Sequence, residues 1–308
     1  MDDCVTSILR QTCTDYEIVL IDDGSQDKSS DMCDNYASKY KNVYVVHQTN
    51  AGAAAARNTG IRNARGEYVI FLDSDDYWYD SQGLDKVDSL MHEDVDVVVF
   101  ASKNLYCDSG EMIDDRYNYP AELNTMEPQL CLEYLITHDL LNMSAAKKAI
   151  RRDFLINNDL FFQQGIRSED VEWGLRLANN LPRYRFLNEK LYVYRHRSNS
   201  VTTTVDEKHL SDYLGIICKF ANYNYHNEEV QNSLLSYVAY QYALLLAYVT
   251  LLKPSRKKEM LDELKKYIFL FQYTSYPRSK IISTVHRIVG FHGTRYFLAL
   301  YLKRSIRT

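Results

Sequence analysis

The first half of the chain alternates short apolar runs with amphipathic stretches, which is the pattern of a βαβ architecture. Runs rich in β-branched and aromatic residues predict strands, and apolar positions three or four residues apart between them predict helices. We therefore expect an α/β fold, with a mostly parallel, Rossmann-like sheet flanked by helices. The predicted strands are Glu17–Ile21, Val43–His47, Tyr68–Leu72 and Val95–Phe100, and the clearest helix is the alanine-rich Ala53–Ala64.

The second half is more irregular and then helical. Residues 101–125 are polar and tyrosine-bearing, and we expect a variable loop there. Beyond about residue 205 the pattern is helical to the end. We therefore expect an α/β domain over 1–204 and a helical, basic region over 205–308. Further helices are predicted at Pro128–His138 and Ser168–Asn179, and further strands at Ala145–Ile150, Tyr184–Leu187 and Leu191–His196.

One segment of the helical region, Leu234–Leu252, has nineteen residues without a formal charge. That length could barely span a bilayer. The segment also contains four tyrosines and Gln241, and Lys253-Pro254 ends it. We expect a buried helix of a helical subdomain rather than a membrane span.

Charge is distributed unevenly along the chain. Residues 253–308 carry thirteen Lys/Arg and three Asp/Glu, a net charge of +10, whereas the whole chain carries −5. The basic region lacks the motifs of nucleic-acid-binding modules, so we expect no nucleic-acid partner. The segment Lys280–Arg307 interleaves apolar and basic residues, which is typical of an interfacial amphipathic helix. Residues 280–308 would then contact an anionic membrane surface; alternatively, their apolar stripe packs on the protein's own core and the basic face is solvated.

Composition narrows the class of protein. The chain has 308 residues, of which 46% are apolar and 25% charged, which excludes global disorder. Its six cysteines form no CxxC pair, which argues against a zinc ribbon or a thioredoxin-like site and fits a reducing compartment. Met1 is followed by two aspartates, and we expect no secretory signal.

Two acidic loops follow predicted strands. Asp73-Ser74-Asp75-Asp76 comes directly after Tyr68–Leu72. Crowded carboxylates repel one another, and a bound divalent cation keeps them ionised together. Mg²⁺ or Mn²⁺ held by one or two carboxylates and phosphate oxygens is the expected use, and an acidic turn or helix cap is the alternative.

The loop Asp22-Asp23-Gly24-Ser25 ends the strand Glu17–Ile21 in the same way. Glycine allows a tight turn, and an aspartate there can accept hydrogen bonds from a base or a ribose. A turn followed by a helix cap would explain the same residues.

Three further segments contain candidate residues. Small residues from Asn50 and Gly52 onward precede Arg57, which can offer a forked cation to phosphate or to the acidic loops, although a lone helical arginine is usually a surface charge. Asp170 lies at a predicted helix start, where acids are favoured by the helix dipole; it could also act as a general base on a hydroxyl. The run Arg195–Ser200 gathers cations, an imidazole and hydroxyls that suit pyrophosphate.

The order of these motifs from about Val5 to Ser200 closely resembles the family-2 glycosyltransferases of GT-A fold. The resemblance implies that Asp170 is the catalytic base, that Asp75 with Asp73 holds Mg²⁺ or Mn²⁺, and that Asp22 and Asp23 contact the nucleoside. The expected donor-binding residues are Asp22, Asp23, Gly24, Asn50, Gly52, Arg57, Asp73, Asp75, Asp76, Arg195, His196, Arg197 and Ser200.

The same resemblance implies the partners. The donor would be a nucleotide-diphospho-sugar, most simply a UDP-sugar, and the acceptor a hydroxyl of a glycan or a lipid-linked glycan. The helical region resembles those of enzymes that build bacterial capsule, O-antigen or exopolysaccharide. We therefore expect a cytoplasmic protein, peripheral on the inner face of the bacterial cell membrane.

The sequence departs from this family in one respect. Family members normally begin with an apolar strand that lies between those predicted at 17–21 and 68–72, and this chain starts inside the following helix. A start assigned too late and a truncated copy both explain the difference. The second explanation keeps open a non-catalytic relative that binds nucleotide or partner enzymes in a polysaccharide-assembly complex. A metal-dependent phosphatase with Asp22 as nucleophile fits less well, because it would want a lysine and a second acidic loop in a different order.

Overall fold

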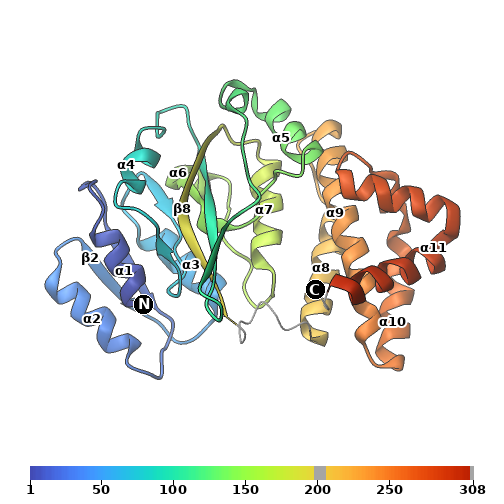
Figure 1. The fold of residues 1–308 in the computed structure, drawn as a ribbon, viewed down its shortest axis with the longest axis horizontal. Helices are drawn as coiled ribbons and strands as arrows, with labels where there is room; N and C mark the ends of the chain where they lie inside the picture. Colours follow the sequence, from blue (N-terminus) through green and yellow to red (C-terminus); the bar gives the residue numbers. More distant parts are fainter. Residues whose placement is uncertain (198–205, 306–308) are drawn as a thin grey trace. The chain divides into compact units, whose positions relative to one another are not determined.

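The computed structural model describes residues 1–197 and 206–305 (Figure 1). The chain divides into two compact units. The first contains Met1–Pro128, Asn142–Gly165 and Glu169–Ser200. The second contains Gln129–Leu141, Ile166–Ser168 and the chain from Val201 onward.

The first unit holds two sheets. Strands β1 (Ile18–Asp22) and β2 (Val43–His47) form a parallel pair. A six-stranded sheet follows the order β3-β7-β5-β8-β4, and β6 pairs with β5. Its strands are β3 (Tyr68–Ile70), β4 (Tyr77–Trp78), β5 (Val97–Tyr106), β6 (Glu111–Asp114), β7 (Lys148–Arg151) and β8 (Tyr184–His196).

The α/β class is confirmed, but the strand pairing is mixed rather than mostly parallel. Strand β8 runs parallel to β5, whereas β7 lies between β3 and β5 and runs antiparallel to both. Strands β4 and β6 are also antiparallel to their partners. Among the described residues no ladder joins β1 to β3, so these two strands belong to separate sheets.

Helices surround the strands of the first unit (Figure 1). The central strand β5 is buried on both faces at Val97–Ala101, which explains why its sequence is a continuous apolar run rather than an alternating one. Phe100 of this strand packs with Trp78 and Tyr192 in one hydrophobic core cluster. The helices are α1 (Asp2–Leu9), α2 (Ser29–Lys39), α3 (Ala53–Asn63), α4 (Gly83–Asp88), α6 (Arg152–Asn157) and α7 (Glu169–Asn179).

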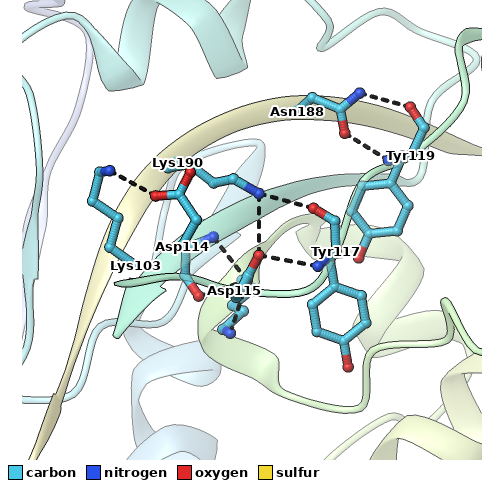
Figure 2. Close-up of polar contacts among 9 residues, drawn as sticks. Lys103, Asp114, Asp115, Tyr117, Tyr119, Asn188 and Lys190 are labelled. Carbon is cyan, nitrogen blue, oxygen red and sulfur yellow. Dashed lines mark hydrogen bonds and ion pairs between the residues drawn. The ribbon is translucent and has the colours of Figure 1, made fainter. Parts of the chain in front are cut away.

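The expectation of a loop over 101–125 is wrong for its first part, because β5 continues to Tyr106 and β6 pairs with it. The segment after β6 is also fixed in place (Figure 2). The buried Asp115 carboxylate accepts hydrogen bonds from Ser102 and pairs with Lys190 and Lys147 at 3.3 and 3.2 Å. Burial raises the pKa of Asp115, but the hydrogen bonds from Ser102 and the two lysines outweigh it and lower the pKa.

The two short strands expected at 184–187 and 191–196 form the single strand β8. Its register against β5 shifts near Ala101, so that Leu187 pairs with Phe100 and Lys190 with Ala101. Asn188, in the residues skipped by this shift, exchanges two hydrogen bonds with the backbone of Tyr119 (Figure 2). The polar residues that suggested a break are therefore a local irregularity within one strand.

The second unit is helical over its described residues. Helix α9 packs against α8 and α11. By length and composition Glu228–Leu251 could cross a membrane, but 72% of its apolar window is buried inside the protein. The expectation of a buried helix is therefore favoured. The helices are α5 (Pro128–Thr137), α8 (Glu207–Ala221), α9 (Glu228–Tyr248), α10 (Pro254–Leu264) and α11 (Pro277–Ser305).

Candidate active site

The first acidic loop, Asp22–Ser25, begins at the end of β1. The Asp22 carboxylate accepts a hydrogen bond from the Ser25 backbone N–H at 3.0 Å and lies 2.8 Å from Nδ1 of His47. His47 ends β2 and is the register partner of Asp22, so the parallel ladder places the two side chains together. The hydrogen bonds from Ser25 and His47 hold the pKa of Asp22 well below its usual range.

Asp23 fixes the segment that leads into α3. One carboxylate oxygen accepts from Gln48 Nε2 at 2.7 Å and from the Ala51 N–H at 2.9 Å, and the other accepts from the Gly52 N–H at 2.8 Å. Gly24 has φ +70°, and a Cβ there would lie 2.8 Å from the Asn50 backbone nitrogen. Glycine at position 24 therefore lets the first acidic loop and the Asn50–Gly52 segment approach each other closely.

Arg57 of α3 joins three carboxylates from distant parts of the chain. Nη1 donates to Glu169 at 2.8 Å and to Asp170 at 3.3 Å, and Nη2 donates to Asp73 at 3.1 Å. Burial by itself lowers the pKa of Arg57, but Asp170, Asp73 and Glu169 outweigh it and raise the pKa. The guanidinium is therefore a permanent cation at the centre of this acidic cluster.

Aromatic rings and an amide side chain pack next to Arg57 and fix the elements around it. Its guanidinium lies 5.4 Å from the Phe162 ring centre, and this ring stacks on Trp173 of α7. Asn58, the next residue of α3, exchanges two hydrogen bonds with the Phe162 backbone at 2.7 and 2.8 Å. The indole of Trp173 donates to the Leu160 carbonyl at 2.8 Å. These contacts hold α3 and α7 in the relative position that the arginine–carboxylate cluster requires.

Asp170 lies in the first turn of α7, and its side chain is 30% exposed. Burial raises the pKa of Asp170 to about 6; Arg57 opposes this shift, and Glu169 and Asp73 add to it. The fully buried Lys148 ammonium donates to the Asn142 and Ser144 carbonyls, and burial lowers its pKa to about 7. With a pKa of about 6, the Asp170 carboxylate can accept a proton near neutral pH.

The residues of the second acidic loop, Asp73–Asp76, differ in their surroundings. The side chains of Asp73 and Asp75 are 42% and 47% exposed, and Asp75 lies 3.8 Å from the Arg197 guanidinium. Asp76 is buried instead: its carboxylate accepts from the Tyr192 hydroxyl and, at 2.8 Å, from the Arg195 N–H. Burial raises the pKa of Asp76 to about 6. The carboxylates of this loop that solvent can reach are thus those of Asp73 and Asp75, each nearly half exposed.

The basic residues at the end of β8 are not gathered in one place. The Arg195 guanidinium donates to Asp3 of α1 at 2.6 Å and lies over the Tyr77 ring. His196 contacts Asn104 at 3.1 Å and stacks on Tyr106, so it is turned toward β5. Among the described residues of this run, Arg197 is the one whose side chain forms an ion pair with the second acidic loop, and Arg195 contacts that loop through its backbone N–H. Ser200 lies outside the described residues, and donor contacts by Asp76, Arg195 and His196 stay predictions.

Two residues of this site escape sequence reasoning. Glu169 reads as an ordinary acid of a first helical turn, yet it makes the shortest of the three Arg57 contacts. His47 reads as the end of a strand, and only the β1–β2 register shows that it pairs with Asp22. An Asp and a His at the carboxyl ends of adjacent parallel strands is the signal that could have indicated this pair.

Asp73 and Asp75 also fit the expected metal. Carboxylate oxygens are the ligands that Mg²⁺ and Mn²⁺ prefer, and two of them leave room for phosphate oxygens and water. Among the described residues no three His, Cys, Asp or Glu side chains form a metal cluster. The donor set therefore suits an ion that a diphosphate completes rather than one enclosed by protein alone.

Comparison with known proteins identifies the family. The family model of glycosyl transferase family 2 matches residues 1–155. The chain belongs to this family. Among its relatives is glycosyltransferase GlyG of Streptococcus pneumoniae, which is 32% identical over 216 residues, covering 66% of this chain and 68% of GlyG. EpsJ of Bacillus subtilis, an uncharacterised glycosyltransferase, is 30% identical over 235 residues, covering 73% of this chain and 66% of EpsJ.

A solved structure shares the fold over nearly the whole chain. The crystal structure of S. aureus TarS 1–349 with UDP-GlcNAc has a TM-score of 0.70 and 19% sequence identity, covering 99% of this chain and 88% of that one. The expectation of a family-2 glycosyltransferase of GT-A fold with a C-terminal helical region is therefore confirmed. The chain spans about two thirds of the length of the relatives EpsJ and GlyG.

Proposed function

We propose that this chain is an inverting, metal-dependent glycosyltransferase that uses a nucleotide-diphospho-sugar, with UDP as the nucleotide. The observation that carries the proposal is the Arg57 cluster, which brings Asp73 of the second acidic loop and Asp170 of α7 to one guanidinium. The solved structure of TarS with UDP-GlcNAc supports the nucleotide and the class of sugar donor.

Each group of residues has a part in the transfer. Asp170 removes the proton of an acceptor hydroxyl as that oxygen bonds to the anomeric carbon, and the bond to the diphosphate breaks with its electron pair leaving on phosphate oxygen. Attack from the face opposite the diphosphate inverts the anomeric carbon. Arg57 keeps Asp170 in position and is itself held by Glu169. Asp73 and Asp75 would hold Mg²⁺ or Mn²⁺, which supplies charge neutralisation at the diphosphate.

The donor's nucleoside is assigned to the first acidic loop and its neighbours. Asp23 is engaged with Gln48, Ala51 and Gly52, so it shapes the nucleoside pocket as well as lining it. Asn50 and Gly52 precede α3, whose first N–H groups favour anionic ligands. Arg197, 3.8 Å from Asp75, is placed to contact the diphosphate.

We assign the acceptor to a glycan or lipid-linked glycan of bacterial surface polysaccharide. The relatives are glycosyltransferases of bacteria that include B. subtilis and S. pneumoniae, and this supports a role in surface-glycan synthesis. The protein would be cytoplasmic and peripheral on the membrane's inner face, through residues 280–308.

A donor screen tests the proposal. Release of UDP or GDP is measured with a panel of sugar nucleotides and Mn²⁺, first for the unsubstituted chain. Asp170→Asn should lower turnover at least ~100-fold with UDP binding retained, because the amide keeps the shape but cannot take the proton. Asp75→Ala should weaken UDP binding and remove its dependence on Mn²⁺, measured by calorimetry.

The exposed Asp153, in the first turn of α6, provides the matched control, and Asp153→Asn should behave as the unsubstituted chain. Turnover by Asp170→Asn at that same rate would contradict the base assignment. UDP binding without turnover of any sugar nucleotide by the unsubstituted chain would support the non-catalytic alternative.

A further inference from the structure

Helix α11 exposes most of its large apolar side chains, and three of the four buried residues among those described are small and polar, the fourth being Leu302. Ile288, Tyr296 and Tyr301 are 78%, 62% and 71% exposed, and Phe297 and Leu300 are also exposed. The buried positions of the same helix include Ser279, Ser283 and Thr294. The alternative that the apolar stripe packs on the protein's own core is therefore wrong for most of these residues. Such a concentration of exposed apolar surface is unusual for a soluble protein and marks an interaction surface.

The exposed residues of the second half of α11 share one face. Tyr296, Phe297, Leu300 and Tyr301 are spaced as i, i+1, i+4 and i+5, which is one side of a helix. Gly290, with φ 64° and ψ −175°, divides α11 just before this segment. We call these four residues the apolar face.

A basic pocket lies between α10 and the second half of α11. Its volume is about 440 Å³, and its lining includes Lys257, Lys258, Lys265, Phe291 and Arg295. The acidic lining residue Asp262 is paired with Lys265 at 2.8 Å. Within 1–197 and 206–305, the side chains of Lys258 and Arg295 form no hydrogen bond or ion pair, although the charge of Lys258, after that of Lys265, helps to lower the pKa of Asp262. The pocket therefore carries an excess of positive charge, because four cationic side chains line it together with the single carboxylate of Asp262.

The pocket opens beside the apolar face. Phe291, His292 and Arg295 line it, and Tyr296 follows His292 by four residues, so these two side chains share one ridge of the helix. A surface that covers the apolar face would therefore reach the pocket at the edge of that face. A bilayer has this layout, with headgroup phosphates beside the hydrocarbon region.

The positive charge of the C-terminal segment favours contact with an anionic membrane surface. Residues 264–308 contain nine Lys/Arg and no Asp or Glu. Clustered basic residues next to an interfacial helix attract anionic lipids, and tyrosines favour the membrane–water interface. A second copy of this chain would offer the same basic segment and would be repelled.

We propose that the pocket between α10 and α11 binds the phosphate group of an anionic lipid while the apolar face of α11 lies in the bilayer surface. Arg295 and Lys258 supply the charge-assisted hydrogen bonds. The inference rests on the membrane location proposed above and adds to it a specific lipid site.

Vesicle co-sedimentation tests this site with the full chain at low salt. Vesicles contain phosphatidylcholine alone or phosphatidylcholine with phosphatidylglycerol. The unsubstituted chain should bind the phosphatidylglycerol vesicles at least ~10-fold more tightly. K258E/R295E should remove that preference, and F297S/L300S should weaken binding to both kinds of vesicle.

Matched controls separate the site from general charge and hydrophobicity. K39E/K41E makes the same change of net charge at exposed residues of the first unit, and L130S/I156S removes two exposed apolar side chains from α5 and α6. Both controls should bind vesicles as the unsubstituted chain does. Equal loss in K39E/K41E and K258E/R295E, or no vesicle binding by the unsubstituted chain, would overturn the proposal.

Two further measurements address other occupants. Soluble glycerol phosphate that displaces the protein from vesicles at concentrations comparable with those of the lipid would overturn the lipid as the source of the phosphate. Light scattering tests for a dimer instead. A dimer that F297S/L300S dissociates, together with an absence of vesicle binding, would overturn the lipid proposal in favour of self-association. Vesicle binding needs no turnover and UDP release needs no vesicle, so failure of the glycosyltransferase proposal is detected separately. Thermal unfolding verifies that each variant is folded.

Discussion

The two acidic loops of the first unit look alike in the sequence and differ in what surrounds their carboxylates. In the first loop, Asp22 and Asp23 accept hydrogen bonds on both oxygens from Ser25, His47 and the backbone of the Asn50–Gly52 segment. In the second loop, Asp73 and Asp75 remain nearly half exposed and face the cations Arg57 and Arg197.

This difference separates a loop that builds the pocket from a loop that can bind a charged ligand. A carboxylate already satisfied by backbone N–H groups has little to offer a metal, because those hydrogen bonds would have to break. An exposed carboxylate beside a fixed cation can change partners at lower cost. The partners of an acidic loop, more than its acidity, therefore indicate its role.

The strongest test of this difference is to remove the cation of the second loop. Arg57→Met leaves Asp73, Glu169 and Asp170 without their common partner. We expect a loss of about 2–3 kcal/mol in the free energy of unfolding, less than for a fully buried pair because the acids are partly exposed. Turnover should fall at least ~100-fold because Asp170 loses its position. Urea unfolding and UDP release measure the two effects.

Arg62, an exposed residue in the last turn of α3, provides the control. Arg62→Met should change neither quantity appreciably, and Arg57→Lys should recover part of the stability because it restores the charge without the fork. If Arg57→Met were as active and as stable as Arg62→Met, the second loop would be held by its own backbone, and the difference between the loops would disappear.

The sequence predicted the elements and the acidic loops better than it predicted their partners. Strands such as Val43–His47 and helix Ala53–Asn63 follow from local apolar patterns. The antiparallel insertion of β7 between β3 and β5 could not be foreseen, because strand order depends on contacts between distant segments. The same reason hid the Arg57–Glu169 pair, whose members are 112 residues apart.

Asp76 tests the buried end of the second loop. Burial raises its pKa to about 6 in the folded protein, above the ordinary value of 3.8. The folded state then binds a proton more tightly than the unfolded state does, so the stabilising contribution is complete below about pH 4 and is lost as the pH rises through 6. Asp76→Asn should flatten the dependence of stability on pH in this window by up to about 3 kcal/mol.

The measurement is thermal unfolding at intervals from pH 4 to pH 7. Asp170 titrates in the same window, since its pKa is also about 6, so the Asp170→Asn chain is compared alongside. Asp88→Asn, at an exposed residue that ends α4, controls for loss of an aspartate. A pH profile of Asp76→Asn identical to that of Asp88→Asn would show that Asp76 does not hold its proton near neutral pH.

The smallest effect is expected in the first loop, at the Asp22–His47 pair. The hydrogen bonds to Asp22 and Asp34 raise the pKa of His47, so its protonated form is favoured in the folded state. The stability from this pair is complete below the ordinary histidine pKa of about 6.5 and is lost as the pH rises through the higher folded value. His47→Gln should therefore lower the melting temperature by a few degrees near pH 6 and converge with the unsubstituted chain at alkaline pH. His92→Gln, at an exposed histidine of the same unit, should leave the melting curve unchanged. A destabilisation by His47→Gln that is the same at every pH would mean that shape, and not charge, joins the two strand ends.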